Sequence, residues 1–407
     1  MEHDQDEYQK LVSMMSSPRV EIDNTASSTA TVVSVNNARN SVKLLDTVRV
    51  LTDLDLTIQK GYISFDGCWF LDVFHVTDER GYKLLDPVLL SHIEHSIVVG
   101  EISSTEDGAT GLMALELTGV DRPGLLSEVC AVLQDLKCNV VEAKMWTHNA
   151  RIACLIFVNN HHSGLIPTAL ADRRPCILTR LRKVLCGSAA KATVVSSSPT
   201  LTHSDRRLHQ LMFRDRGDDE ASSSSSSHSK PSVSVQSLAE RGYSVVNVQC
   251  LDRPKLLFDV VCTLTDMDYD VFHGKFGVDA DRAFQEFYIR RMDGSMLSSE
   301  TERQRVIHCV QAAIERRASE GVRLALSMPD RRGLLAEVTR VFRENGLMIR
   351  SVEIATKNGE AKDEFCVTDI SGRLPDSGTV NAVIELIGEG HLIKLTEQSR
   401  NVHSGEA

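Results

Sequence analysis

A short string of residues occurs three times in the chain, and its residue types suit the binding of a carboxylate. The copies read DRPGLLSEV from Asp121, DRPKLLFDV from Asp252 and DRRGLLAEV from Asp330. Apolar residues continue after each copy at helical spacing, so each string lies where a helix begins. Open backbone N–H groups in the first turn of a helix attract anions, and a glycine such as Gly124 leaves them uncovered. The string therefore predicts a small carboxylate receptor.

A second candidate group is Asn139, which stands near the start of the apolar run after the first of these helices. An asparagine side chain both donates and accepts hydrogen bonds, so Asn139 suits the α-amino group or the side-chain amide of a bound amino acid.

The same strings also have structural interpretations. An aspartate before a helix is often a helix-terminus residue or the partner of an arginine, and Pro-Gly marks a turn. Gly124 and Gly333 fit a turn and a ligand site equally well. The paired leucines are expected in the hydrophobic core (Leu125, Leu126, Leu334 and Leu335).

The elements that position these groups repeat with the string. An apolar strand-like run precedes each copy, a helical stripe follows it, and two further strand-like runs come next with a turn between them. A second helix and a final strand, clearest at residues 192–195, close the unit. This βαββαβ order predicts an α+β fold of the ferredoxin-like class, in which an antiparallel sheet carries helices on one face.

A fourth, weaker copy of the unit stands at the front of the chain, with strand-like runs at 31–35, 56–63 and 69–77. There Val42-Lys43 occupies the place of Gly-Leu, and Thr57 the place of the asparagine.

The remaining copies also differ at the candidate binding positions. In the third, Lys255 replaces the glycine and Asp270 the asparagine, and in the fourth Gly333 is kept but Met348 replaces the asparagine. Because only the second copy has the full set, we expect one or two competent pockets, with the other modules acting as pairing partners.

The interval between the second and third copies is longer than the others and requires an insertion. Residues 197–242 contain charged stretches and six consecutive serines, Ser222 to Ser227. Such a composition buries little apolar surface, so at least 217–236 is expected to be a flexible linker, with a phosphorylated regulatory tail as the alternative. The expected domains are an N-terminal segment 1–30, module 1 with a degenerate loop at 31–107, module 2 at 112–196, the linker at 197–242, module 3 at 243–319 and module 4 at 322–401.

Modules of this size have small cores. We therefore expect them to pair side by side across shared sheet edges, as two double modules around the serine-rich tether.

Composition limits the possible functions. The chain has 407 residues, 42% hydrophobic and 25% charged, which is typical of a globular protein, and its formal charge of −11 disfavours nucleic-acid binding. No apolar run approaches the ~18 residues of a membrane helix, and the chain opens with an acidic segment, so an intracellular location is expected, cytoplasmic or nuclear. Ten scattered cysteines without a C-x-x-C pair predict neither a disulfide framework nor a metal site. No nucleotide-binding loop or catalytic motif appears, so we expect no cofactor and no enzymatic activity.

The DRPGLL string after an apolar strand, with Cys138-Asn139-Val140 at the start of the second strand, resembles the ACT domain, a small regulatory module that binds amino acids. Four such units, the segment HSDRRLHQLMF from His203 and the segment VFHVTD from Val73 resemble the plant ACR (ACT domain repeat) proteins over about residues 31–401. The resemblance implies a ligand between the loop after the first strand of one unit and the second strand of a neighbour, where Gly124 and Asn139 are the matching positions. The candidate amino-acid contacts that it implies are Asp121, Arg122, Gly124, Leu125, Asn139, Asp330, Gly333 and Leu334.

Two functions are consistent with these patterns. The first is a non-enzymatic amino-acid sensor, in which ligand occupancy changes how modules pack or how a client protein is engaged. Glutamine is the ligand suggested by analogy with bacterial uridylyltransferases, which carry tandem ACT modules. The second is a protein-interaction scaffold without a small-molecule ligand, in keeping with the degenerate loops. The expected partners are a free amino acid, the modules themselves, a second copy of the chain and an unidentified client protein, with no membrane and no nucleic acid.

Overall fold

The computed structural model describes residues 19–38, 44–65, 69–99, 112–160, 168–185, 190–195, 203–214, 230–317, 321–388 and 390–395. The chain divides into two compact units, which are best described one at a time. Unit 1 comprises residues 1–104 and 225–314, and unit 2 comprises residues 105–224 and 315–407. Each unit therefore takes one stretch from either half of the chain.

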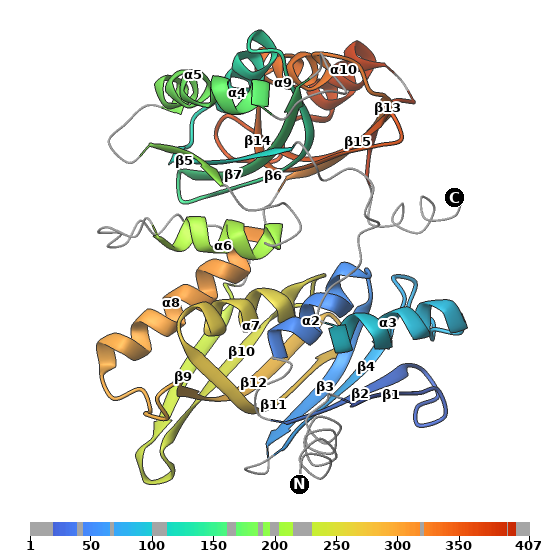
Figure 1. Ribbon diagram of the computed structural model, residues 1–407, viewed down its shortest axis with the longest axis vertical. Helices are drawn as coiled ribbons and strands as arrows, with labels where there is room; N and C mark the ends of the chain where they lie inside the picture. Colours follow the sequence, from blue (N-terminus) through green and yellow to red (C-terminus); the bar gives the residue numbers. More distant parts are fainter. Residues whose placement is uncertain are drawn as a thin grey trace, which may run out of the picture. The chain divides into compact units, whose positions relative to one another are not determined.

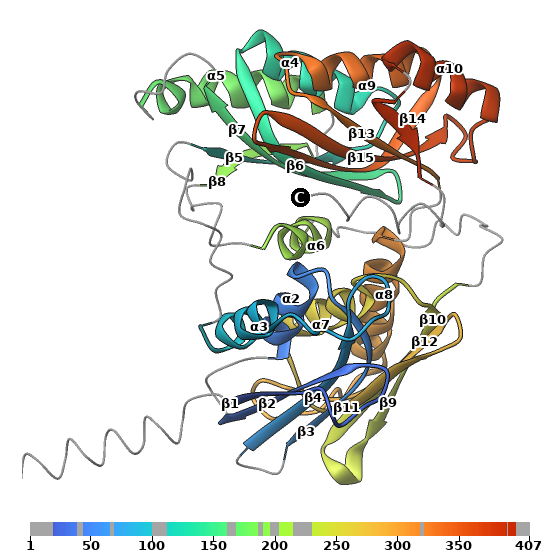
Figure 2. The same ribbon diagram turned by 90° about the vertical axis from the view of Figure 1, so that its right-hand side faces the viewer.

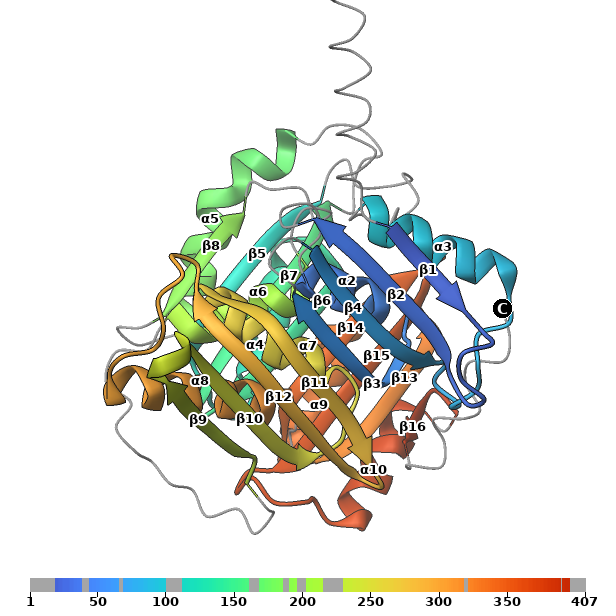
Figure 3. The same cartoon turned by 90° about the horizontal axis from the view of Figure 1, so that it is seen from below.

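Unit 1 contains one eight-stranded antiparallel sheet with its helices on one face (Figures 1 and 3). The strand order is β1-β2-β4-β3-β11-β12-β10-β9, so modules 1 and 3 join where β3 pairs with β11, with Ile63 opposite Gly274. A single hydrophobic core extends through both modules. The elements are β1 Arg19–Asp23, β2 Thr31–Ala38, α2 Leu44–Asp53, β3 Thr57–Phe65, β4 Trp69–Thr77, α3 Pro87–Val99, β9 Ser232–Leu238, η2 Ala239–Arg241, β10 Tyr243–Leu251, α7 Leu256–Asp266, β11 Tyr269–Asp279, β12 Arg282–Arg291 and α8 Glu300–Arg317. The last three residues of α8, 315–317, belong to unit 2.

Unit 2 has the same plan, with strand order β16-β13-β15-β14-β6-β7-β5-β8. Modules 2 and 4 join where β6 pairs antiparallel with β14, with Met145 opposite Val352, and the helices α4 and α9 lie next to each other on one face of the sheet (Figure 2). The elements are β5 Met113–Val120, α4 Leu125–Asp135, β6 Cys138–His148, β7 Arg151–Asn160, α5 Thr168–Leu185, β8 Lys191–Val195, α6 Ser204–Arg214, β13 Val322–Pro329, α9 Leu334–Glu344, β14 Leu347–Lys357, β15 Glu360–Asp369, α10 Ser377–Ile387 and β16 Leu392–Lys394.

The antiparallel α+β class is confirmed, but the modules pair differently from the expectation. Module 1 pairs with module 3 and module 2 with module 4, so the double modules do not stand on either side of the expected linker. The modules of a unit join through two strands, here called seam strands, which are β3 and β11 in unit 1 and β6 and β14 in unit 2. The order of the modules along the chain does not determine which modules pair.

The outermost strand also enters from different ends of the modules. In modules 2 and 4 it follows the second helix, as β8 and β16, whereas in modules 1 and 3 it precedes the first strand, as β1 and β9. Both arrangements place an antiparallel strand beside the first strand. Strand β9 and helix α6 consequently lie inside 197–242, and β1 lies inside 1–30. The six serines are outside the described residues.

The paired leucines of the strings lie in the hydrophobic core. Leu125, Leu126 and Leu334 are buried, and Leu335 is half-buried and packs against the same core, as the sequence predicted. Of the helices in the described part of the chain, none has the length and apolarity needed to cross a membrane.

Candidate functional site

The aspartate that opens each string ties its loop to the hairpin of its own module. The backbone N–H of Asp121 donates to the carbonyl of Ala150 at 2.8 Å, and that of Asp330 donates to Gly359 at 2.8 Å. Asp252 makes the same bond to Asp281. The loop before each helix is therefore held by the turn between the second and third strands.

The arginine of each string pairs with the acid six residues later. Arg122 contacts both carboxylate oxygens of Glu128, at 2.8 and 2.5 Å, and Arg331 lies 2.5 Å from Glu337. Arg253 repeats the pair with Asp259. The bond from Arg122 holds the pKa of Glu128 below its ordinary value. These arginines fasten the loop to the first turn of the helix, which is a structural role that the sequence left open for Arg122.

The residue directly before each helix has a left-handed backbone. Gly124 has φ 78° and Gly333 has φ 81°, and Lys255 adopts φ 64° at the matching position. Glycine adopts this conformation without the steric cost that a Cβ brings. Each glycine lacks a capping side chain. Within the described residues, the backbone N–H groups of the next turn, Leu126 with Ser127 and Leu335 with Ala336, have no acceptor.

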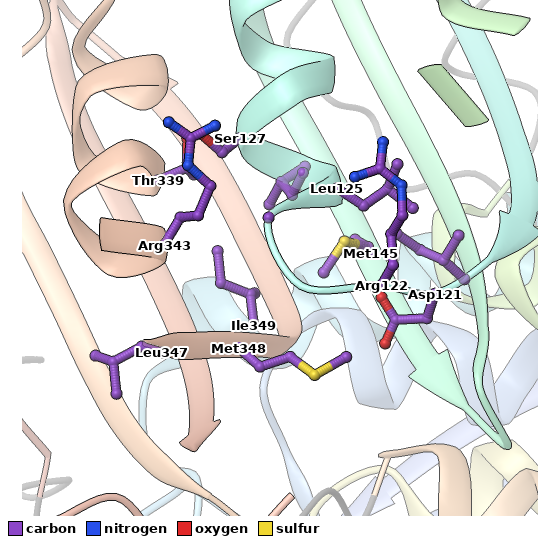
Figure 4. Close-up of a pocket in the computed structure, with 13 residues that line it drawn as sticks. Asp121, Arg122, Leu125, Ser127, Met145, Thr339, Arg343, Leu347, Met348 and Ile349 are labelled. Carbon is purple, nitrogen blue, oxygen red and sulfur yellow. The ribbon is translucent and has the colours of Figure 1, made fainter. Parts of the chain in front are cut away.

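The first cavity, here called the Gly124 site, lies between the loop of module 2 and the start of β14 in module 4. It is open to solvent, and its space, part of which is bulk solvent, amounts to about 310 Å³. Figure 4 shows Ser127, Thr339 and Arg343 toward the helices, and Leu347, Met348 and Ile349 along the strand. The remaining lining residues are Asp121, Arg122, Gly124, Leu125, Leu126, Met145 and Ile152.

The second cavity, here called the Gly333 site, is the counterpart with the modules exchanged. It lies between the loop of module 4 and the start of β6 in module 2 and is open to solvent, and its space, part of which is bulk solvent, amounts to about 470 Å³. Asn139 and Val140 form the strand side. The other lining residues are Cys130, Leu133, Gln134, Lys137, Cys138 and the run 330–336.

In each site a side chain from the opposite helix lies over the glycine. A Cβ added to Gly124 would stand 2.5 Å from Cδ of Arg343 in α9, and one added to Gly333 would collide with the amide of Gln134 in α4. Gln134 and Arg343 are both the tenth residue of their helices. The two modules thus build both sites together, through an approximate twofold relation.

The eight residues predicted from the sequence divide equally between the two sites. Four of them line the Gly124 site (Asp121, Arg122, Gly124 and Leu125), and four line the Gly333 site (Asn139, Asp330, Gly333 and Leu334). The expected combination of Gly124 with Asn139 does not occur in one cavity. Because β6 and β14 run antiparallel at the seam, the loop with Gly333 meets Asn139, and the loop with Gly124 meets Met348.

Sequence reasoning did not identify Gln134 and Arg343. The sequence feature that could have identified them is that both occupy the tenth position of their helices. This feature is informative only when modules 2 and 4 are known to be partners. The structure holds no cluster of histidine, cysteine and acidic side chains suited to a metal within its described residues.

Modules 2 and 4 each hold a carboxyl group whose pKa is raised by burial. Burial raises the pKa of Asp121 to about 6, against the opposing effect of the Arg350 guanidinium, and its Oδ2 atom has no partner in the described part of the chain. Asp363 on β15 is 3% exposed, and burial raises its pKa to about 7. The backbone N–H of Ala355 opposes this shift, and the charge of Asp330 adds to it. At the matching position of β7 stands the thiol of Cys154.

Models of known families match three of the four modules. The model of the ACR family N-terminal ACT domain matches residues 26–104, that of the ACT domain matches 112–173, and that of an ACR9-like, ACT-like domain matches 232–326. The ACT domain-containing protein ACR8 of Arabidopsis thaliana is 53% identical over 388 residues, covering 94% of this chain and 87% of that protein. The ACT domain-containing protein ACR6 of the same plant is 48% identical over 406 residues, covering 96% and 92%.

Proposed function

The chain belongs to the ACT domain-containing ACR proteins, and from this premise we propose that it is a regulatory protein that binds a free amino acid at the Gly333 site. One observation carries the proposal. The seam between modules 2 and 4 brings the open backbone N–H groups after Gly333, the carboxyl group of Asp330 and the amide of Asn139 to one cavity.

These groups complement the parts of an amino acid. Open N–H groups at the start of α9 suit the α-carboxylate. The Asp330 carboxylate suits the ammonium group, and Asn139 and Gln134 can donate to or accept from a polar side chain. Glutamine satisfies all three requirements and is our first candidate ligand.

The function we infer is control by occupancy, without catalysis. A ligand held by residues of both modules favours the paired state by its differential affinity for that state. A client protein in the cytoplasm or nucleus would respond to this change. The arginine of each string forms an ion pair with an acid of its own module. Because these charged groups already have partners, they are less suited to catalysis, which favours ligand binding as the function.

Calorimetric titration of the full chain with each of the twenty amino acids tests the proposal. We expect a polar amino acid to bind, and Asn139→Leu to weaken that binding at least tenfold. Asn247→Leu on β10 of unit 1 is the matched control, since it removes an asparagine from a strand that lines neither site. Absence of heat and of a thermal shift with every amino acid, on folded protein, would overturn the proposal.

A protein-interaction scaffold is the second candidate, and the outer face of the unit 1 sheet favours it. Tyr62, Trp69 and Phe284 are 53%, 41% and 41% exposed on β3, β4 and β12, and Figure 3 shows no described helix over these strands. Exposed aromatic groups of this kind often mark protein contacts. A scaffold requires that Tyr62→Asp with Phe284→Asp abolish client binding while Asn139→Leu leaves it intact.

A further inference from the structure

We infer that the Gly124 site is a second binding site that selects an amino acid with an apolar side chain, so that the chain responds to two chemically different ligands. The inference rests on the proposed function, because it assumes that the cavities between modules 2 and 4 receive amino acids. It is carried by the differences between the two sites at matched positions.

The two sites differ most in the residues that their strands contribute. Leu347, Met348 and Ile349 open β14 in the Gly124 site, whereas the matching residues of β6 in the Gly333 site are Cys138, Asn139 and Val140. The two strands match in register, because both carry a bulge directly after their third residue. The single polar group of this wall, the Asn139 amide, is therefore replaced by a thioether.

The polar side chains of the Gly124 site come from its helices and its loop, whereas those from β14 are apolar. Figure 4 shows Ser127, Thr339 and Arg343 at the helices and Asp121 and Arg122 at the loop. The Thr339 hydroxyl already donates to the Leu335 carbonyl at 2.7 Å. Arg343 is 41% exposed, and its guanidinium lies 3.9 Å from Glu344, a weak pair that leaves donors available.

A zwitterion fits this polarity with its α-groups toward the loop. The open N–H groups of Leu126 and Ser127, with the Arg343 guanidinium, suit the α-carboxylate. The buried Oδ2 of Asp121 has no partner within the described residues and suits the ammonium group. In the Gly333 site the residue that covers the glycine is the neutral Gln134, so carboxylate recognition there depends more on the backbone.

The side chain of such a ligand then extends along Met145, Met348 and Ile349. Burying a polar side chain against this wall would leave its donors and acceptors unpaired, which is unfavourable. An apolar side chain pays no such cost, and methionine walls adapt to chains of different shape. Leucine and methionine are therefore the expected ligands, and glutamine is disfavoured.

Calorimetry on the full chain with leucine, methionine and glutamine as probes tests the inference. We expect leucine or methionine to bind with glutamine already saturating its own site, giving two independent events. Met348→Asn should weaken binding of the apolar amino acid at least tenfold and leave glutamine binding unchanged. Asn139→Met should weaken glutamine binding and leave binding of the apolar amino acid unchanged. Met292→Asn on an exposed turn of unit 1, where the methionine is 67% exposed, is the matched control for substitution.

The outcomes separate the inference from the function on which it rests. Binding of a polar amino acid alone, or loss of every ligand with Asn139→Met, overturns the second site and leaves the proposed function intact. Absence of binding by all amino acids overturns both. If Met348→Asn fails to fold, Arg343→Gln on the exposed helix surface replaces it, and unchanged affinity for the apolar probe in that variant refutes the inference.

Discussion

At the scale of single residues, sequence reasoning succeeded where a residue acts within its own module. The leucines of the string pack in the core as predicted, with Leu335 half-buried, because helical spacing alone points them there. The sequence allowed either a turn or a ligand site as the reason for Gly124 and Gly333. Their left-handed backbone shows that the conformation itself favours glycine at both positions. Arg343 and Gln134 were missed because their role depends on a partner module that no local pattern names.

The first residue-scale prediction concerns Asp363, which burial holds at a pKa of about 7. A carboxyl group whose folded pKa lies above its unfolded pKa near 4 binds more protons when folded, so its contribution to stability declines as pH rises from about 4 to 7. Asp363→Asn should therefore raise the free energy of unfolding of unit 2 at pH 7.5 by roughly 1–4 kcal/mol, and by much less at pH 4.5.

Urea unfolding at the two pH values, on the wild type and the variant, measures this difference. Asp281→Asn, an exposed turn residue whose backbone carbonyl keeps its bond to Asp252, is the control and should change neither value. An equal effect of Asp363→Asn at both pH values would show that the carboxyl group is already protonated or already paired in the folded chain.

At the scale of elements, helix α6 and strand β9 explain why the expected linker was drawn too long. Strand β9 has the sequence SVSVQSL, in which Val233 and Val235 face the core while the neighbouring Ser232 and Ser234 are exposed. Such an edge strand is difficult to distinguish from a serine-rich tether by composition. In α6, Leu208, Leu211 and Met212 form an apolar stripe that packs on the outer face of the module 2 sheet, against Trp146, Leu155 and Phe157.

The attachment of α6 depends on Asp205, which is completely buried in the first turn of the helix. Its carboxylate lies 2.8 Å from Lys144 Nζ and 3.1 Å from Arg317 Nη2. Although burial opposes the charged form of Lys144, the carboxylates of Asp205 and Glu353 raise its pKa above the ordinary value. Removing one partner of a buried pair leaves an uncompensated charge and typically costs about 3–5 kcal/mol.

Asp205→Ala should therefore detach α6 from the sheet. The indole of Trp146 is buried under α6, with the His209 ring centroid at 4.9 Å, so its fluorescence should shift to longer wavelength as water reaches it. Trp69→Phe in the background leaves Trp146 as the only tryptophan. Asp135→Ala, at the exposed end of α4, is the control. An unchanged emission spectrum in Asp205→Ala would mean that the apolar stripe and the ion pair of Arg207 with Glu116 hold the helix without Asp205.

At the scale of the whole molecule, the repeat predicted the number and kind of modules, and it could not predict their partners. The repeat does not say which module pairs with which, so chain order favoured pairing of neighbours. The seams instead join β3 to β11 and β6 to β14, and each hydrophobic core contains residues from both halves of the chain. Pairing depends on which seam strands and helices fit each other, as with Phe276 of β11, whose ring lies where a side chain at position 61 would be and so requires Gly61 in β3.

This interleaved pairing predicts how the chain behaves when it is divided. A cut after residue 224 leaves modules 1 and 2 in one fragment and modules 3 and 4 in the other, so each unit loses half of its core and exposes a seam strand. Unpaired apolar edge strands promote aggregation. Each fragment expressed alone should therefore be insoluble or poorly folded, whereas the two fragments expressed together should copurify in equal amounts through a tag on either one. If neighbours paired, as the order of the modules suggests, each fragment would instead fold alone and the tagged fragment would purify without the other.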